Sequence, residues 1–303
     1  MSTASGLRPP PGRQGPGPLP AGLVDALDLA MARRASGALP GERKAPGVGS
    51  GTELFQLRPY QPGDDVRQLD AAASARTGIP HVRLQVPERA LTTWLVLDVS
   101  PSMAFGTADR LKADVAEGVV LVLGRLAARR GGRVALLTSG SRIQRFLPPR
   151  SGRGALAPLR RMAAEGVAPD GHDDPEALTR TLRRVAQLAR HPGLVVVVSD
   201  FRGPRTWRRA LAALRARHST LAVEIRDPRE LELPEVGHLA LIDPETGERV
   251  EIDTHSARLR ERFAEAEREG RTAVAADLRH ALAEHIVLTT DGDWLRALGG
   301  RLR

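Results

Sequence analysis

Thr92 to Phe105, with the sequence TTWLVLDVSPSMAF, is the stretch that decides the fold of this chain. Its first half is continuously apolar, which is typical of a parallel strand whose two faces are both covered. The strand ends at Asp98, and Ser100 and Ser102 follow at alternate positions. Because alternate residues leaving a strand can point the same way, three oxygen-bearing side chains are expected to converge just beyond it.

A second apolar run, LVVVVSDF at residues 194–201, places Asp200 just after another strand. Around these two runs, apolar residues recur alternately at strand and at helix spacing to the end of the chain. Such alternation predicts an α/β fold, namely a doubly wound, mainly parallel, Rossmann-like sheet with right-handed crossovers. Ligands of such sheets lie at the carboxyl ends of the strands, so Asp98 and Asp200 are expected to share one site.

The chain divides by composition into three parts. Residues 1–20, rich in proline and glycine, predict a disordered tail. Residues 21–90 contain an amphipathic helix at 21–35 and a later segment dense in arginine and aspartate, and they are expected to pack on the main domain. The charged segment is either a solvated loop or a buried lattice of Arg–Asp pairs. Residues 91–303 form the main domain, with a hairpin and a long helix near 238–283.

Composition restricts the possible classes of protein. The 303 residues include no cysteine, which excludes disulfides, thiolate metal sites and cysteine nucleophiles. The start of the chain lacks the apolar core of a signal peptide, and no run approaches the roughly 18 apolar residues that span a bilayer. A cytoplasmic protein with no membrane span is therefore expected. The net charge of +9 suggests nucleic acid, but the cations are spread along the chain and aromatic residues make up only 3%, so nucleic-acid binding is the weaker interpretation.

The oxygens of Asp98, Ser100, Ser102 and Asp200 form a candidate metal site. Hard oxygen ligands without cysteine or histidine favour Mg²⁺, Mn²⁺ or Ca²⁺ over Zn²⁺. The alternative is that Ser100 and Ser102 only cap the helix that follows the strand.

The same residues carry a family resemblance. DVSPSM, with SDF on a later strand, resembles the metal-ion-dependent adhesion site of von Willebrand factor A domains, whose motif is Asp-x-Ser-x-Ser. The segments GTELFQLRPYQPGDDVRQLDAAASARTG, RDPRELELPEVG and IDPETGE resemble the bacterial domain-of-unknown-function-58 family, from about Leu23 to the end of the chain. The resemblance implies a von Willebrand factor A-like domain after a family-specific N-terminal segment. It further implies that Ser100 and Ser102 bind the ion directly, with Asp98 and Asp200 binding directly or through water.

Two departures from the family pattern affect these expectations. A threonine ligand is usual in the loop before a later helix, but this loop is Gly171-His172-Asp173-Asp174-Pro175. Asp173 is the candidate for its place, which would raise the affinity for the ion or shift the preference towards Ca²⁺; alternatively, the site is degenerate and empty. Ala71 stands where the family commonly has tryptophan.

Two functions remain open from the sequence. The resemblance implies a non-enzymatic interaction module that depends on Mg²⁺ or Mn²⁺. Its partner would be a MoxR-type AAA+ ATPase, or another protein that offers a carboxylate, in chaperone-like or complex-assembly work. The alternative is a metal-dependent phosphoester hydrolase in which Asp98 and Asp200 hold Mg²⁺.

Overall fold

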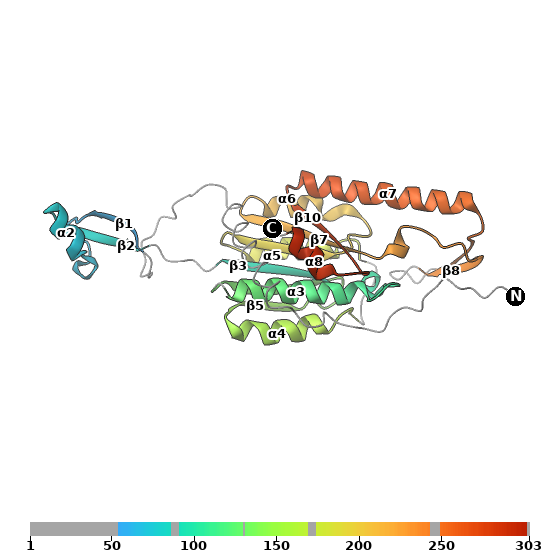
Figure 1. Ribbon diagram of the computed structural model, residues 1–303, viewed down its shortest axis with the longest axis horizontal. Coiled ribbons are helices and arrows are strands. Elements are labelled where there is room, and N and C mark those ends of the chain that lie inside the picture. The colour runs from blue at the N-terminus through green and yellow to red at the C-terminus, as the bar shows by residue number, and fades with distance from the viewer. Residues whose placement is uncertain (1–53, 86–90, 130, 169–173, 243–248, 302–303) are drawn as a thin grey trace. The chain divides into compact units, whose positions relative to one another are not determined.

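The computed structural model describes residues 54–85, 91–129, 131–168, 174–242 and 249–301. These residues belong to two compact units, one before residue 90 and one after it, and each is described by itself (Figure 1). The tail at 1–20 and the helix expected at 21–35 lie outside the described residues. The packing of residues 21–90 on the main domain stays a prediction.

The smaller unit is an antiparallel pair of strands joined by two short helices. Its elements in chain order are β1 (Leu54–Pro59), η1 (Val66–Gln68), α2 (Ala71–Thr77) and β2 (His81–Gln85).

The aspartates of this unit serve its own turns and helix starts. Asp64 receives two hydrogen bonds from the guanidinium of Arg58, at 2.6 and 2.8 Å. Asp65 caps η1, and Asp70 caps α2 by accepting from the N–H of Ala73 at 2.8 Å. Within the described part of this unit, these carboxylates thus accept hydrogen bonds from local backbone N–H groups, and Asp64 also from Arg58, so the segment is not simply a solvated loop. The buried lattice of Arg–Asp pairs stays a prediction.

The larger unit is built on a six-stranded sheet. In spatial order the strands are β10 (Glu284–Thr289), β7 (His218–Arg226), β6 (Gly193–Ser199), β3 (Thr92–Asp98), β4 (Arg133–Ser139) and β5 (Phe146–Ser151). All neighbouring pairs are parallel except β4 and β5. Counted from β3 along the chain, the order is 3-2-1-4-5-6, which is that of a doubly wound sheet. The fold class expected from the sequence is confirmed.

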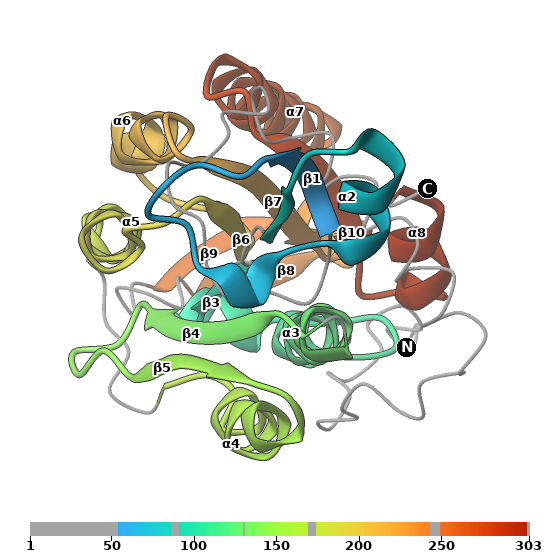
Figure 2. The same ribbon diagram turned by 90° about the vertical axis from the view of Figure 1, so that its left-hand side faces the viewer.

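Helices cover both faces of this sheet (Figure 2). One face packs against α3 (Lys112–Arg129), α4 (Arg153–Ala164) and α8 (Trp294–Arg301). The other face packs against α5 (Ala177–Leu188), α6 (Arg208–Leu214) and α7 (Ala257–His280).

The central strand β3 contributes side chains to both layers of this core. Leu95 and Leu97 belong to the first layer, and Trp94 and Val96 to the second. Each fully buried apolar side chain of this size contributes about 1.5–3 kcal/mol. The continuously apolar run is thus explained by burial on both faces, and it holds the end of β3 in a fixed position.

Local side-chain contacts set the start of two elements. Strand β5 begins at Phe146, because residues 141–145 form a loop in which Gln144 binds the backbone of Thr138. Helix α3 begins at Lys112. The residues before it form a turn in which the N–H and hydroxyl of Thr107 donate to Asp227, at 2.8 and 2.6 Å.

The remaining elements follow the expected plan. The strands of the predicted hairpin are β8 (His238–Ile242) and β9 (Arg249–Asp253), which pair antiparallel, and its turn lies outside the described residues. The long helix is α7, which Ser256 caps. Three short helices complete the unit: η2 (Pro101–Ala104), η3 (Arg205–Trp207) and η4 (Pro228–Glu230). Nowhere in the described chain is a helix both long and apolar enough to cross a membrane.

Candidate functional site

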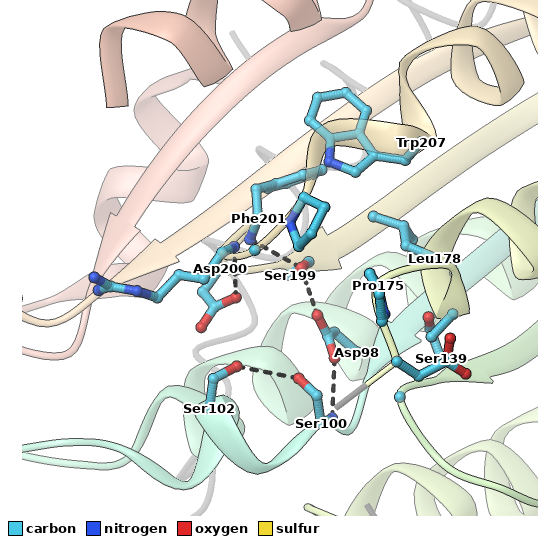
Figure 3. A pocket seen from close by; sticks show the side chains of 16 residues that line it. Asp98, Ser100, Ser102, Ser139, Pro175, Leu178, Ser199, Asp200, Phe201 and Trp207 are labelled. Atoms are coloured by element: carbon cyan, nitrogen blue, oxygen red, sulfur yellow. Dashed lines mark hydrogen bonds between the residues drawn. The ribbon is translucent and has the colours of Figure 1, made fainter. Parts of the chain in front are cut away.

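The strand order of the sheet brings the two predicted aspartates together. Asp98 is the last residue of β3, and Asp200 follows the last residue of β6, its parallel neighbour. The order of the sheet reverses between these two strands, which makes this edge the topological switch point. Asp98, Ser100, Ser102 and Asp200 line one pocket of about 100 Å³, as the sequence predicted (Figure 3).

Asp98 is a partly buried carboxylate whose described contacts are hydrogen bonds. Its Oδ1 accepts from the N–H of Ser100 at 3.0 Å, and its Oδ2 accepts from the hydroxyl of Ser199 at 2.5 Å (Figure 3). Within the described part of the chain, no cationic side chain forms an ion pair with it. Burial, and then the neighbouring charge of Asp200, raise the pKa of Asp98 above its ordinary value. A cation at this place would relieve both effects.

The two serines of the motif present their hydroxyls to each other. The Oγ atoms of Ser100 and Ser102 lie 3.1 Å apart. Adjacent ligands of an octahedral Mg²⁺ with bonds of about 2.1 Å are separated by about 3 Å, so this spacing suits a shared ion. Ser100 does stand at the start of η2, but its side chain makes no capping hydrogen bond. Helix capping therefore does not account for Ser100.

Asp200 already has a cation from the chain itself. The ammonium of Lys112, which is fully buried, lies 2.6 Å from Oδ2 of Asp200 and 2.6 Å from Oε1 of Glu230. The N–H of Arg202 donates to Oδ1 of Asp200 at 3.1 Å. Burial alone would raise the pKa of Asp200, but the charge and hydrogen bond of Lys112 outweigh it and hold that pKa below its ordinary value.

An ionic cluster extends behind Asp200 into the molecule. Arg271 of α7 donates to the carbonyl of Asp200 at 2.9 Å and to Glu224 at 2.8 Å, and it lies 3.3 Å from Glu230. Burial raises the pKa of Glu224, but hydrogen bonds from His285 and Arg226 and the charges of both arginines lower it to about 2. Helix α7 is thereby tied to the backbone of the site.

Two backbone features fix the shape of the pocket. Gly140, after β4, has a φ of +92°, and a Cβ there would lie 2.7 Å from the backbone N of Ser100. Only glycine allows so close an approach in that conformation. Phe201 also has a positive φ, of 53°, and packs edge-on against Trp207 with ring centres 5.3 Å apart. Aromatic packing thus stabilises the strained turn that follows Asp200.

The fifth predicted ligand is not placed in the same way. Asp173 lies outside the described residues. Its neighbour Asp174 lines the pocket, but its carboxylate forms an ion pair with Arg180.

Sequence reasoning missed Lys112, Glu230, Ser199 and Arg271. One signal was available for Lys112, because the chain has only two lysines, Lys44 and Lys112, among its 45 basic residues. An ammonium is a compact charge with three donors, which suits a narrow buried gap between carboxylates better than a guanidinium does. No comparable signal marked Ser199 or Arg271.

The donor set fits a small divalent cation next to Asp98. That carboxylate is uncompensated within the described chain, and two hydroxyls at ligand spacing lie beside it. Asp200 is a poorer direct ligand, because the ammonium of Lys112 already neutralises its charge.

The strand order, the antiparallel edge strand and the Asp-x-Ser-x-Ser sequence at the switch point define the class: this is a von Willebrand factor A-like domain. Residues 56–273 match the family described as "Protein of unknown function DUF58", and the chain belongs to that family.

One mycobacterial relative covers most of the chain, and another covers about half of it. "Uncharacterized protein Rv1480" of Mycobacterium tuberculosis is 40% identical over 278 residues, which are 91% of this chain and 86% of the relative. "Uncharacterized protein MAV169" of Mycobacterium avium is 42% identical over 151 residues, which are 49% of this chain and 87% of the relative.

Solved structures with similar folds are more distant. The hypothetical protein BatB from Bacteroides thetaiotaomicron has a TM-score of 0.43 at 14% identity, covering 70% of this chain and 97% of its own. The SpRpn10 VWA domain has a TM-score of 0.36 at 12% identity, covering 69% and 93%. At these scores the likenesses add nothing to the fold already described.

Proposed function

We propose that this protein is a non-enzymatic interaction module whose pocket holds Mg²⁺ or Mn²⁺ and takes a carboxylate from a partner protein. The observation that carries the proposal is the partly buried carboxylate of Asp98, which no cationic side chain of the described residues neutralises, beside two hydroxyls 3.1 Å apart.

Each residue of the site has its own role in this proposal. Ser100 and Ser102 would hold the ion directly, and Asp98 would supply the negative charge. Asp200 would act through water, since the ammonium of Lys112 already neutralises its charge. Few direct carboxylate ligands leave a divalent ion electrophilic, so that it attracts an anionic group from outside. Asp173 stays a candidate for a further ligand, and with it a preference for Ca²⁺.

The size of the pocket supports a protein partner over a small substrate. Its volume of about 100 Å³ lies well below the roughly 300–1,000 Å³ of small-molecule sites. A single protruding aspartate or glutamate side chain fits such a space.

The alternative, a metal-dependent phosphoester hydrolase, needs a free cation to bind the phosphate. Arg202 lines the pocket, but its guanidinium lies 3.0 Å from Glu230 and 2.5 Å from Glu267. The charge of Arg202 is therefore largely used within the protein, so a phosphate held in this pocket would have to rely on the ion itself or on arginines outside the pocket.

For the partner we propose a MoxR-type AAA+ ATPase in the cytoplasm, in chaperone-like or complex-assembly work. Membership of the family supports this choice, because such ATPases are the partners that the sequence resemblance implies.

The test is capture of the purified ATPase by the immobilised protein, in Mg²⁺ and in EDTA. Capture is expected in Mg²⁺ only, and Asp98→Ala should abolish it. Asp291→Ala is the matched control, because this exposed aspartate follows β10 much as Asp200 follows β6. Equal capture by Asp98→Ala in EDTA would rule out the metal-bridged function. Hydrolysis of para-nitrophenyl phosphate that Asp98→Ala loses would favour the enzyme instead.

A further inference from the structure

A second pocket adjoins the candidate metal site along the edge of the sheet. Its volume is about 310 Å³, and it lies between the end of β4, the loop after it and the first half of α5. Ser139, Gly140 and Ala177 line both pockets. A ligand can therefore reach both at once.

Three arginines line this second pocket, and their charges are not equally compensated. Arg180 forms an ion pair with Asp174. Arg142 and Arg184 line the same space, and neither forms an ion pair with a carboxylate of the described residues. The described lining of the pocket thus carries a net positive charge, next to a site whose ion would attract an anion under the proposed function.

The pocket is also held in shape by hydrogen bonds. The side-chain amide of Gln144 donates to the carbonyl of Thr138 at 3.0 Å and to the hydroxyl of Thr181 at 2.7 Å. Its Oε1 accepts from Arg184 at 2.8 Å, and that guanidinium lies 5.7 Å from the ring centre of Phe146. One of the uncompensated guanidiniums is therefore oriented before any ligand binds.

We propose that this cationic pocket binds a second carboxylate of an acidic peptide segment in the partner protein. The metal-site carboxylate rests on the proposed function, whereas the arginine contact does not depend on a metal. Guanidiniums form bidentate hydrogen bonds with carboxylates. Ile143, in the same loop, is 77% exposed and offers an apolar contact to a peptide. A nucleic-acid strand is less suited, because no aromatic residue lines the described pocket, and the ring of Phe146 beside it already contacts Arg184 and stacks with Trp94.

The probe is a fluorescein-labelled peptide of eight glutamates, and its binding is followed by fluorescence polarisation in Mg²⁺ and in EDTA. Arg142→Glu and Arg184→Glu are each expected to weaken binding about tenfold in both conditions. The matched control is Arg183→Glu, which makes the same charge change at an exposed position of α5 outside the pocket and should stay within about twofold.

The outcomes separate the two proposals. Equal losses for Arg183→Glu and Arg184→Glu would overturn the pocket, whatever EDTA does. If the arginine dependence persists while EDTA has no effect, the pocket stands and the metal-bridged function fails. An octathymidylate that binds more tightly than the peptide, with the same dependence on Arg142 and Arg184, would overturn the assignment to an acidic peptide.

Discussion

The two carboxylates at the switch point of the sheet differ in where their counter-charge comes from. Asp200 contacts the buried ammonium of Lys112, and an ionic cluster with Glu230 and Arg271 stands behind it. Asp98 is partly buried, and within the described chain it has only hydrogen-bond donors. The half of the site around Asp200 is thus neutralised within the protein, whereas in the function that we propose the half around Asp98 would be neutralised by a cation from solution.

The largest effect on stability is expected from removing the ammonium that neutralises Asp200. Lys112→Met leaves Asp200 and Glu230 as buried charges that have lost their shared partner. The free energy of unfolding in urea should fall by about 3–5 kcal/mol. Adding Asp200→Asn and Glu230→Gln should recover part of the loss, because the charges that need Lys112 are then gone. A loss below about 1 kcal/mol in the Lys112→Met variant would mean that the ion pairs of Lys112 do not support the fold.

Acid should lower the stability of the ionic cluster behind Asp200. The pKa of Glu224 lies at about 2, below its ordinary value of 4.5. A lowered carboxyl pKa stabilises the protein above pH 4.5, and the stabilisation is lost as the pH falls towards 2. The shift corresponds to about 3 kcal/mol.

The measurement for Glu224 is the free energy of unfolding against pH. Glu224→Gln should be less stable than the parent at pH 7 and should lose less between pH 5 and pH 2. Glu251→Gln, at an exposed position of β9, is the control and should follow the parent curve. Parallel curves for Glu224→Gln and the parent would contradict the account.

A smaller effect on stability is expected from displacing the backbone of Ser100, which stands beside Asp98. Gly140→Ala puts a Cβ against the backbone of Ser100 at a positive φ, and it should cost about 2 kcal/mol. It should also weaken binding of Mn²⁺, measured by calorimetry. Gly154→Ala is the control, because nothing lies near that Cβ and alanine favours a helix. Unaltered Mn²⁺ binding in Gly140→Ala would show that Ser100 needs no such support.

The smallest effect is expected far from both carboxylates. Arg249 and Glu251 form an ion pair at 2.9 Å, with side chains 62% and 75% exposed. Arg249→Ala should change the free energy of unfolding by less than about 0.5 kcal/mol. A cost close to that of Lys112→Met would show that burial is not what separates these ion pairs.

The sequence predicted the half of the site that depends on local pattern. The apolar runs of β3 and β6 placed Asp98 and Asp200 at one sheet edge, and the spacing of Ser100 and Ser102 made their hydroxyls meet. The alternation of strands and helices was enough for the fold class, because burial on both faces leaves a clear record in the sequence.

The residues that neutralise Asp200 were not predictable from the local sequence pattern. Lys112, Glu230 and Arg271 come from two helices and a short turn that are far apart in the chain. Each looks like an ordinary surface charge in its own segment. Only tertiary packing brings them behind Asp200, and a residue-by-residue pattern holds no record of that packing.

The central claim is that Asp98 lacks a counter-charge which a divalent ion supplies. The most direct test is thermal unfolding with and without Mg²⁺ for the parent protein and for Asp98→Asn. Mg²⁺ at 100 times its dissociation constant is expected to raise the free energy of unfolding of the parent by about 2.7 kcal/mol. No such gain is expected for Asp98→Asn, which in EDTA should be at least as stable as the parent. Equal stabilisation of both proteins by Mg²⁺, or a marked loss of stability in Asp98→Asn without the ion, would contradict it.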